Sequence, residues 1–341
     1  MKITIVDSEP PIAPDRGTTR RAFIRGRTLP IGDLLRLQTI LVPLDFSDSS
    51  MQALKYAIPL AEKFKAAIHL IHVQPDDELT AISRAGQLML NCADAIALMQ
   101  DRLAEIQRAH DVQFWPDNCH VPSGRPDHEI CRLAATIKAD LIVLSTHGYT
   151  GLKHVVLGST AERVVRFAPC PVLVLRGAKY QATSLDDSVM TDFKLGRILV
   201  PVDFSKCSLA GVRYAARLAR SMGASLHLFH AVYPYAQVIG FDRMSSTSGS
   251  LVQIATETAR EEMARLKAMT FLQDITCETE VRVGPTADAI SNTSGRREID
   301  LLVTSTHGRT GFRRALLGSV AEQVVRYAKC PVITVPSRSR F

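Results

Sequence analysis

Two stretches of the sequence place glycines, hydroxyl side chains and a histidine at nearly the same spacing. They read STHGYTGLKHVVLGS at 145–159 and STHGRTGFRRALLGS at 305–319. Each lies between an apolar run and a segment with helical spacing of apolar residues. Glycines let a ligand approach the backbone closely and allow positive φ, and successive N–H groups ahead of a helix favour anions. The pattern predicts two sites for a di- or triphosphate.

A carboxylate is expected at the same edge of each predicted unit. Asp45 and Asp203 follow Pro43 and Pro201 at the ends of matching apolar runs. A carboxylate at that edge can accept a hydrogen bond from an adenine amine or a ribose hydroxyl, or bind a metal-bridged phosphate. Together with the glycine loops, the two carboxylates favour nucleotide binding.

A structural interpretation of the same residues is also open. In it, Gly158 and Gly318 only allow close helix packing, and Asp45 and Asp203 are turn or N-cap residues of the next helix. The carboxylate, the glycine loop and the Gly-Ser helix start recur together in both halves of the chain. This joint recurrence favours the nucleotide site.

The repetition extends over almost the whole chain. ILVPLDFS at 40–47 returns as ILVPVDFS at 198–205, an offset of 158 residues. Residues 140–175 and 300–335 are identical at 21 of 36 positions, so the duplication covers a full domain rather than a short solenoid repeat. We expect a basic N-terminal extension at 1–37, domains at 38–176 and 196–341, and a linker at 177–195.

The elements that must position these residues alternate between strand and helix. In the first half, strands are expected at 39–43, 67–73, 118–122, 140–144 and 171–175. Helices are expected at 49–65, 78 to about 110, 127–137 and 159–167. The second half repeats the series from 197 to 335, with a flexible piece at 245–250. Strands that are apolar on both faces and alternate with helices predict an α/β fold, with two tandem doubly wound five-stranded parallel-sheet domains of the Rossmann-like or flavodoxin-like kind.

Composition narrows the class of protein. The chain has 341 residues and a net charge of +7, with no apolar run long enough to span a bilayer. Its seven cysteines include no CxxC pair, which argues against a disulfide framework or a zinc site. Cys170 and Cys330 are interpreted as packing residues. Residues 1–37 show no secretory signal, so a cytoplasmic location is expected. The basic stretch at 16–27 favours a solvated tail over a nucleic-acid contact.

These residues resemble the tandem two-domain members of the universal stress protein family, over 38–176 and 196–336. Nucleotide-binding members carry Gly, two residues, Gly, nine residues, Gly and then Ser or Thr. The last two glycines and the hydroxyl residue are present in both halves, as Gly148, Gly158 and Ser159 and as Gly308, Gly318 and Ser319. Ser145 and Ser305 replace the first glycine. Because serine is small, we expect reduced rather than lost binding.

The loops and the resemblance together predict one nucleotide site in each half. The first comprises Pro43, Asp45, Val73, Leu144, Ser145, His147, Gly148, Gly158, Ser159 and Thr160. The second comprises Pro201, Asp203, Ala231, Thr304, Ser305, His307, Gly308, Arg309, Gly318, Ser319 and Val320. The resemblance implies that the backbone of Val73 or Ala231, directly after a strand-end histidine, meets adenine. We interpret those histidines, His72 and His230, as satisfied core groups.

The resemblance implies an ATP-binding regulatory protein of the stress response, with ADP, AMP and cyclic nucleotides left open and Mg²⁺ accompanying the phosphates. Catalytic residues and protein metal ligands are not expected, because neither a Walker A lysine motif nor a committed base is visible. Two alternatives stay open: a slow or self-phosphorylating ATPase, and an interaction scaffold without nucleotide. The resemblance also implies that strands 171–175 and 331–335 pair the halves into an intramolecular pseudo-dimer, which can pair again as a homodimer. No membrane partner is expected.

Overall fold

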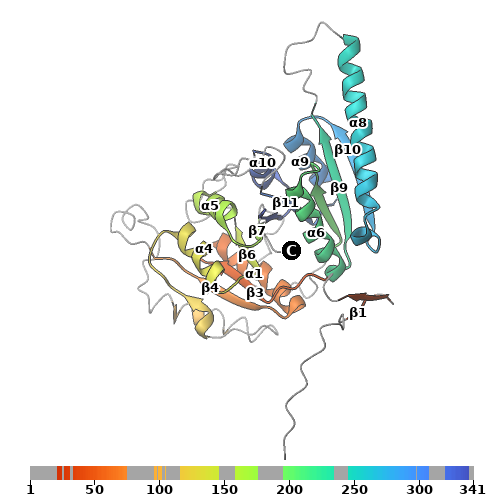
Figure 1. Cartoon of the computed structure of the whole chain (residues 1–341). Helices are drawn as coiled ribbons and strands as arrows, with labels where there is room; N and C mark the ends of the chain where they lie inside the picture. Colours follow the sequence, from red (N-terminus) through yellow and green to blue (C-terminus); the bar gives the residue numbers. More distant parts are fainter. Residues whose placement is uncertain are drawn as a thin grey trace, which may run out of the picture.

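Ten strands form one sheet that runs through both halves of the chain (Figure 1). The structure is a computed structural model that describes residues 21–24, 27–30, 34–74, 96–97, 99–101, 104, 116–145, 158–175, 195–233, 245–296, 298–306 and 319–337. The strand order is β10-β9-β8-β11-β12-β7-β6-β3-β4-β5. We refer to the described residues from 34 to 175 as the first unit and to those from 195 to 337 as the second unit.

The two units contain the same series of elements. The strands of the first unit are β3 (Thr39–Pro43), β4 (Ala67–Ile71), β5 (Cys119–His120), β6 (Leu141–Ser145) and β7 (Val172–Leu175). Those of the second are β8 (Arg197–Pro201), β9 (Ser225–Val232), β10 (Cys277–Val283), β11 (Leu301–Ser305) and β12 (Val332–Val335). The helices are α1 (Asp48–Phe64), α4 (Pro126–Thr136), α5 (Ser159–Phe167), α6 (Lys206–Met222), α8 (Ser245–Lys267), α9 (Thr286–Arg296) and α10 (Ser319–Tyr327). Two 3₁₀ turns, η2 (Pro116–Asn118) and η4 (Thr270–Leu272), and an antiparallel pair, β1 (Arg21–Ile24) with β2 (Arg27–Pro30), complete the described elements.

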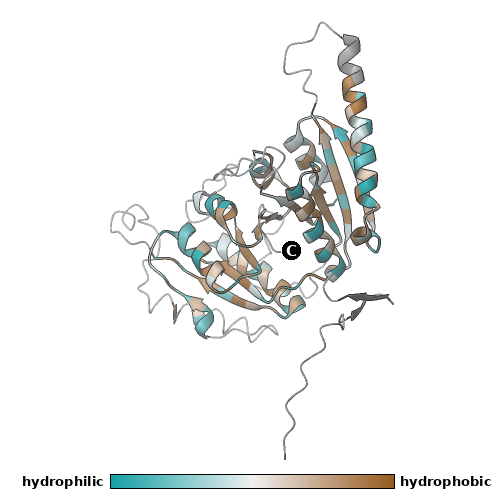
Figure 2. Cartoon of the chain, in the orientation of Figure 1, coloured by the Kyte–Doolittle hydropathy of each residue, from teal (hydrophilic) through white to brown (hydrophobic). Residues whose placement is uncertain are grey.

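Helices cover both faces of the sheet. In β3, the side chains of Ile40 and Val42 belong to one hydrophobic cluster and that of Leu41 to the other, and all three are 0% exposed. The first cluster contains residues of α1, α6 and α8, and the second contains residues of α4, α5, α9 and α10. Figure 2 shows hydrophobic residues concentrated along the strands. Burial on both faces explains why the strands read as nearly continuous apolar runs, and it confirms the predicted fold class.

The two units join through their last strands. β7 and β12 are antiparallel, with Val172 opposite Thr334, Leu173 opposite Ile333 and Val174 opposite Val332. The strand pairs within each unit are parallel. Leu173 and Ile333 are 1% and 3% exposed, so the joint is part of the core. The predicted pairing of residues 171–175 with residues 331–335 is confirmed.

Some predicted elements differ from the observed ones. β5 is shorter than the strand predicted at 118–122. Residues 245–250, predicted to be flexible, form the start of α8, so that prediction is wrong. Met263 and Leu266 anchor this helix in the core, and extending a nucleated helix costs little per residue. The helix predicted from 78 to about 110 lies largely outside the described residues. Within the part of the chain that the structure describes, no helix has the length and apolar character that a membrane span requires.

Candidate functional site

The predicted site residues that the structure describes lie near the edge of the sheet where the parallel strands end. β3 lies between β4 and β6, and β8 lies between β9 and β11. The chain leaves β3 toward β4 and later returns on the other side to form β6, so strand order reverses between β3 and β6. Open α/β sheets bind ligands outside the carboxyl ends of strands at such a reversal. Pro43 and Ser145 end the two strands in the first unit, and Pro201 and Ser305 end them in the second.

A tight turn follows β3 and carries Asp45. The backbone N–H and the hydroxyl of Ser47 both donate to Asp45 Oδ1, at 3.1 and 2.5 Å. Ser47 Oγ in turn accepts from Ser50 N at 3.2 Å, so Ser47 is the N-cap of α1. Of the two roles in the structural interpretation of Asp45, turn residue or N-cap, the structure shows the turn role, and the N-cap is Ser47.

The second unit repeats this turn after β8. Ser205 N donates to Asp203 Oδ1 at 3.0 Å, and Ser205 Oγ accepts from Ser208 N at 3.1 Å. Between each aspartate and serine lies a phenylalanine with positive φ, Phe46 at 60° and Phe204 at 61°. A bulky residue in this region is an outlier that the surrounding structure must hold in place. The same strained geometry in both units indicates a preserved turn.

Besides the aspartate turn, each candidate site includes the chain just beyond the neighbouring strand, β4 in the first unit and β9 in the second. Leu44 N donates to Ile71 O at 2.8 Å, and Val202 N donates to Phe229 O at 2.8 Å. These bonds hold the Asp45 and Asp203 turns against the neighbouring strand end. Val73, predicted to meet a base through its backbone, is buried, and its counterpart Ala231 is half-buried.

Each candidate site also includes the end of β6 or β11 and the start of the helix that follows it. Leu144, Thr304 and Ser305 are buried, and Ser145 is half-buried. Gly158 is the N-cap residue of α5 with a φ of −57°, so this glycine does not use the positive φ that glycine allows. Gly158 has no side chain with which to cap the first amides of α5.

The remaining predicted residues can be placed only in part. Ser159 is exposed, and Thr160 and Val320 are half-buried, in the first turns of α5 and α10. Ser319 is the first residue of α10. His147, Gly148, His307, Gly308, Arg309 and Gly318 lie outside the described residues. Within those residues, no cluster of three or more His, Cys, Asp or Glu side chains forms a metal site.

Cys170 and Cys330 lie at the starts of the last strands, away from this edge. Burial raises the pKa of both thiols to about 12. A thiol with such a pKa stays protonated at neutral pH and is a poor nucleophile. The interpretation of both cysteines as packing residues fits these environments.

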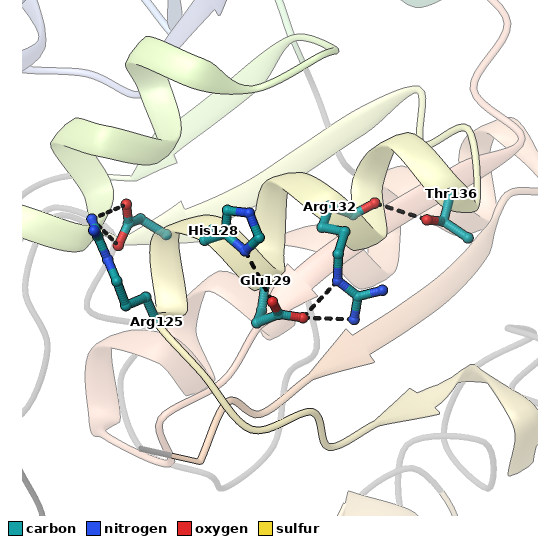
Figure 3. A network of polar contacts seen from close by, with 6 residues as sticks. Arg125, His128, Glu129, Arg132 and Thr136 are labelled. Atoms are coloured by element: carbon teal, nitrogen blue, oxygen red, sulfur yellow. Dashed lines mark hydrogen bonds and ion pairs between the residues drawn. The ribbon is translucent and has the colours of Figure 1, made fainter. Parts of the chain in front are cut away.

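A polar network along α4 was not found from the sequence (Figure 3). Arg125 contacts Asp127 at 3.0 Å, and Glu129 lies between His128 at 3.0 Å and Arg132 at 2.6 Å. The hydrogen bond from Arg132 lowers the pKa of Glu129. Asp127 and Glu129 lie in the first turn of α4, where their negative charges interact favourably with the positive end of the helix dipole. The i,i+3 spacing of Glu129 and Arg132 was the available signal.

The arrangement defines a class of protein with two joined, doubly wound α/β units that carry matching turns at the carboxyl edges of their strands. A model of the Universal stress protein family matches residues 36–176 and 194–336. The chain therefore belongs to the universal stress protein family, in its tandem form.

Known relatives agree with this assignment. A universal stress protein of Mycolicibacterium smegmatis is 27% identical over 305 residues, which cover 88% of this chain and 97% of the relative. One from Methanocaldococcus jannaschii is 36% identical over 142 residues, 41% of this chain and 82% of the relative. The crystal structure of a universal stress protein from Archaeoglobus fulgidus aligns with a TM-score of 0.57 at 19% identity, covering 88% of this chain and 98% of that one. This structural likeness shows a shared fold.

Proposed function

We propose that each unit binds one adenine nucleotide, ATP foremost, in the crevice between β3 and β6 or between β8 and β11. In this proposal the protein is a regulatory binding protein of the stress response. The observation that carries the proposal is the start of α5, where the N-cap residue is a glycine, Gly158, and offers no side chain to the first amides of the helix.

The starts of α1 and α5 differ in a way that suits a phosphate. α1 begins with the side chain of Ser47 bonded to its first turn. α5 begins at Gly158, and the first amides of a helix have no partner within the helix. Such amides, with the helix dipole, favour a phosphate oxygen. The glycine-rich residues ahead of α5 and α10, including Gly148, would complete this phosphate site.

The opposite end of each crevice suits the base and the sugar. Asp45 and Asp203 each use Oδ1 within the turn, and a carboxylate has about four lone-pair sites. In this proposal each carboxylate also accepts a hydrogen bond from an adenine amine or a ribose hydroxyl. Val73 and Ala231 would meet the base through their backbones. Apolar contact would come from Pro43, Pro201 and Leu144, and from Thr304 through its methyl group.

Binding without efficient turnover is the function that the described residues support best. Phosphoryl transfer requires a positioned nucleophile and charge stabilisation in the transition state. The crevice offers no committed base among the described residues. A slow ATPase and a nucleotide-free scaffold remain the competing functions. ADP, AMP or a cyclic nucleotide could occupy the same crevice, and Mg²⁺ would accompany a triphosphate.

Calorimetric titration with ATP tests the proposal. The wild-type chain is expected to bind in both units. Asp45→Asn and Asp203→Asn preserve an acceptor oxygen for the turn but remove the negative charge. Each is expected to weaken its own site by about 10- to 100-fold, because a hydrogen bond to a charged group contributes about 1.5–3 kcal/mol. Asp48→Asn, at an exposed position in the first turn of α1, is the matched control. Absence of ATP binding by the wild-type chain would refute the proposal.

A further inference from the structure

The histidine that follows β4 binds the turn that follows β3. His72 Nδ1 lies 2.9 Å from Leu44 O, and its ring centroid lies 4.8 Å from that of Phe46. A backbone carbonyl only accepts hydrogen bonds, so Nδ1 must carry the proton and donate it. In a neutral ring, Nε2 is then an acceptor. The contact thus fixes both the orientation and the tautomer of His72.

The second unit contains the same contact. His230 Nδ1 lies 2.7 Å from Val202 O, and its ring centroid lies 4.7 Å from that of Phe204. His230 follows Phe229, whose carbonyl holds Val202 N at 2.8 Å. Two copies of one arrangement in a duplicated chain show that it is a property of the unit rather than of one packing environment.

Each histidine also holds the residue that precedes the aspartate through a hydrogen bond. The N–H of Leu44 donates to Ile71 O at 2.8 Å, and the carbonyl of Leu44 accepts from His72, the next residue after Ile71. Both polar groups of Leu44 are therefore held by the end of β4. The chain leaves β3 in a fixed direction, and Asp45 follows immediately.

The same ring also packs against the strained residue on the far side of the aspartate. Phe46 adopts a φ of 60°, a conformation that a bulky side chain rarely takes. Its ring packs against the imidazole of His72 with a tilt of 43° between the two planes. Asp45 is thus flanked by two residues that one histidine holds.

Val73 directly follows His72. The side chain of His72 therefore links the Asp45 turn to the segment that carries Val73, and both would face the base. We propose that His72 and His230 are positioning residues of the nucleotide sites: each holds its aspartate turn in register with the chain beyond the neighbouring strand. The inference rests on the proposed function, because the held segments are the proposed base-binding ones. It replaces the interpretation of these histidines as core groups only.

Substitutions of each histidine that keep an N–H donor at one ring position or the other test the inference. Asparagine places an N–H group near the position of Nδ1, whereas glutamine places it near that of Nε2. Both remove the ring, so any difference between them reports the bond to Leu44 O or Val202 O. His72→Asn, His72→Gln and His72→Ala are made in the full chain, together with the same three substitutions at His230.

The readouts are ATP titration, thermal unfolding and long-range ¹H–¹⁵N spectra of the imidazoles. Glutamine and alanine are expected to weaken ATP at the altered unit by at least about 10-fold while the other unit binds as before, since a lost hydrogen bond and a looser site both reduce affinity. Asparagine is expected to bind ATP more tightly than glutamine or alanine, because it keeps a donor near the position of Nδ1 although it loses the ring contact. The spectra of the wild-type chain are expected to show the Nδ1–H tautomer at both histidines.

Several results would overturn the inference. One is equal ATP affinity for the asparagine, glutamine and alanine variants at similar unfolding temperatures. Another is an Nε2–H tautomer in the wild-type chain. If a variant of one unit fails to fold, the series in the other unit decides the matter. A wild-type chain that shows the Nδ1–H tautomer but binds no ATP would refute the proposed function, and with it the positioning role.

Discussion

His69 Nδ1 lies 3.1 Å from His120 Nε2, with the two rings nearly parallel at 9°. The contact joins β4 to β5 at the edge of the first unit. At the matching place in the second unit, His227 Nε2 lies 2.8 Å from Glu280 Oε2. The duplicated fold therefore pairs two histidines in one copy and a histidine with a carboxylate in the other. Protonation of both rings in the first unit would place two like charges about 3.1 Å apart, so the first unit should be sensitive to acid.

We expect the first unit to lose stability on acidification. Burial lowers the pKa of His69 below its ordinary value of 6.5, and the neighbouring His120 lowers it further. Burial also lowers the pKa of His120. As the pH falls below 6.5, the unfolded chain binds more protons than the folded chain. The free energy of unfolding therefore decreases until the pH reaches the pKa values of the folded state.

A substitution that copies the second unit checks this expectation. His120→Glu places a carboxylate beside His69, which favours the protonated imidazole. Calorimetric unfolding between pH 7.5 and pH 5 should show a steeper loss of unfolding temperature for the wild-type chain than for this variant. Parallel curves for wild type and His120→Glu would contradict the account.

Gly211→Ala should stabilise the second unit. Gly211 lies within α6, where a Cβ would meet Ser305 N at 3.7 Å, an ordinary contact distance. The first unit already carries Ala53 at the matching position of α1, 0% exposed. Replacing a helical glycine by alanine gains about 0.5–1 kcal/mol, or about 1–4 °C in unfolding temperature.

Gly284→Ala is the matched control with the opposite sign. Its added Cβ would meet nothing within 4 Å, but its φ is +150°, which alanine rarely adopts. We expect a loss of about 1–2 kcal/mol from backbone strain alone. Equal effects of the two substitutions in thermal unfolding would show that the backbone geometry at these positions is misassigned.

The ion pair of Arg220 with Asp274 should be important for the stability of the second unit. Two nitrogens of Arg220 donate to the two oxygens of Asp274 at 2.7 Å each, and Arg220 also donates to Phe271 O. The arginine side chain is only 6% exposed. Arg220→Met should lower the free energy of unfolding by about 3 kcal/mol, because it leaves a poorly hydrated carboxylate without its partner.

An exposed pair on the same unit provides the comparison. Arg265 lies 2.6 Å from Glu262, with side chains 69% and 41% exposed. Arg265→Met should change the free energy of unfolding by less than about 1 kcal/mol, because water already solvates both charges. Chemical denaturation of both variants measures the difference. Similar losses for the two substitutions would contradict the assigned role of burial.

Much of the fold could be predicted because its local signals agree with its tertiary structure. The run Thr39–Pro43 is apolar on both faces and ends in turn residues, and it forms β3 over the predicted bounds. The helix at residues 159–167 was predicted in the same way and is α5. Residues 245–250 were predicted to be flexible because Ser, Thr and Gly have low helix propensity. They are helical because α8 is anchored by residues nearer its C-terminal end.

The candidate site could be predicted only as far as its repeated residues allowed. Asp45 and Asp203 stood out because the motif around them recurs. The contact of His72 with Leu44 depends on the register of β3 and β4, in which Pro43 lies opposite Ile71. Sequence spacing does not specify that register, so the histidines were interpreted as core groups. The pairing of His69 with His120 likewise requires two strands that are distant in sequence.

The nucleotide content of the purified chain tests the central claim most directly. The chain is denatured, released small molecules are identified by chromatography and mass spectrometry, and the emptied and refolded chain is dialysed to equilibrium against ATP. The account predicts an adenine nucleotide, released or rebound, approaching one molecule per unit. No released nucleotide together with no ATP bound at equilibrium would contradict it and would leave the interaction scaffold as the function.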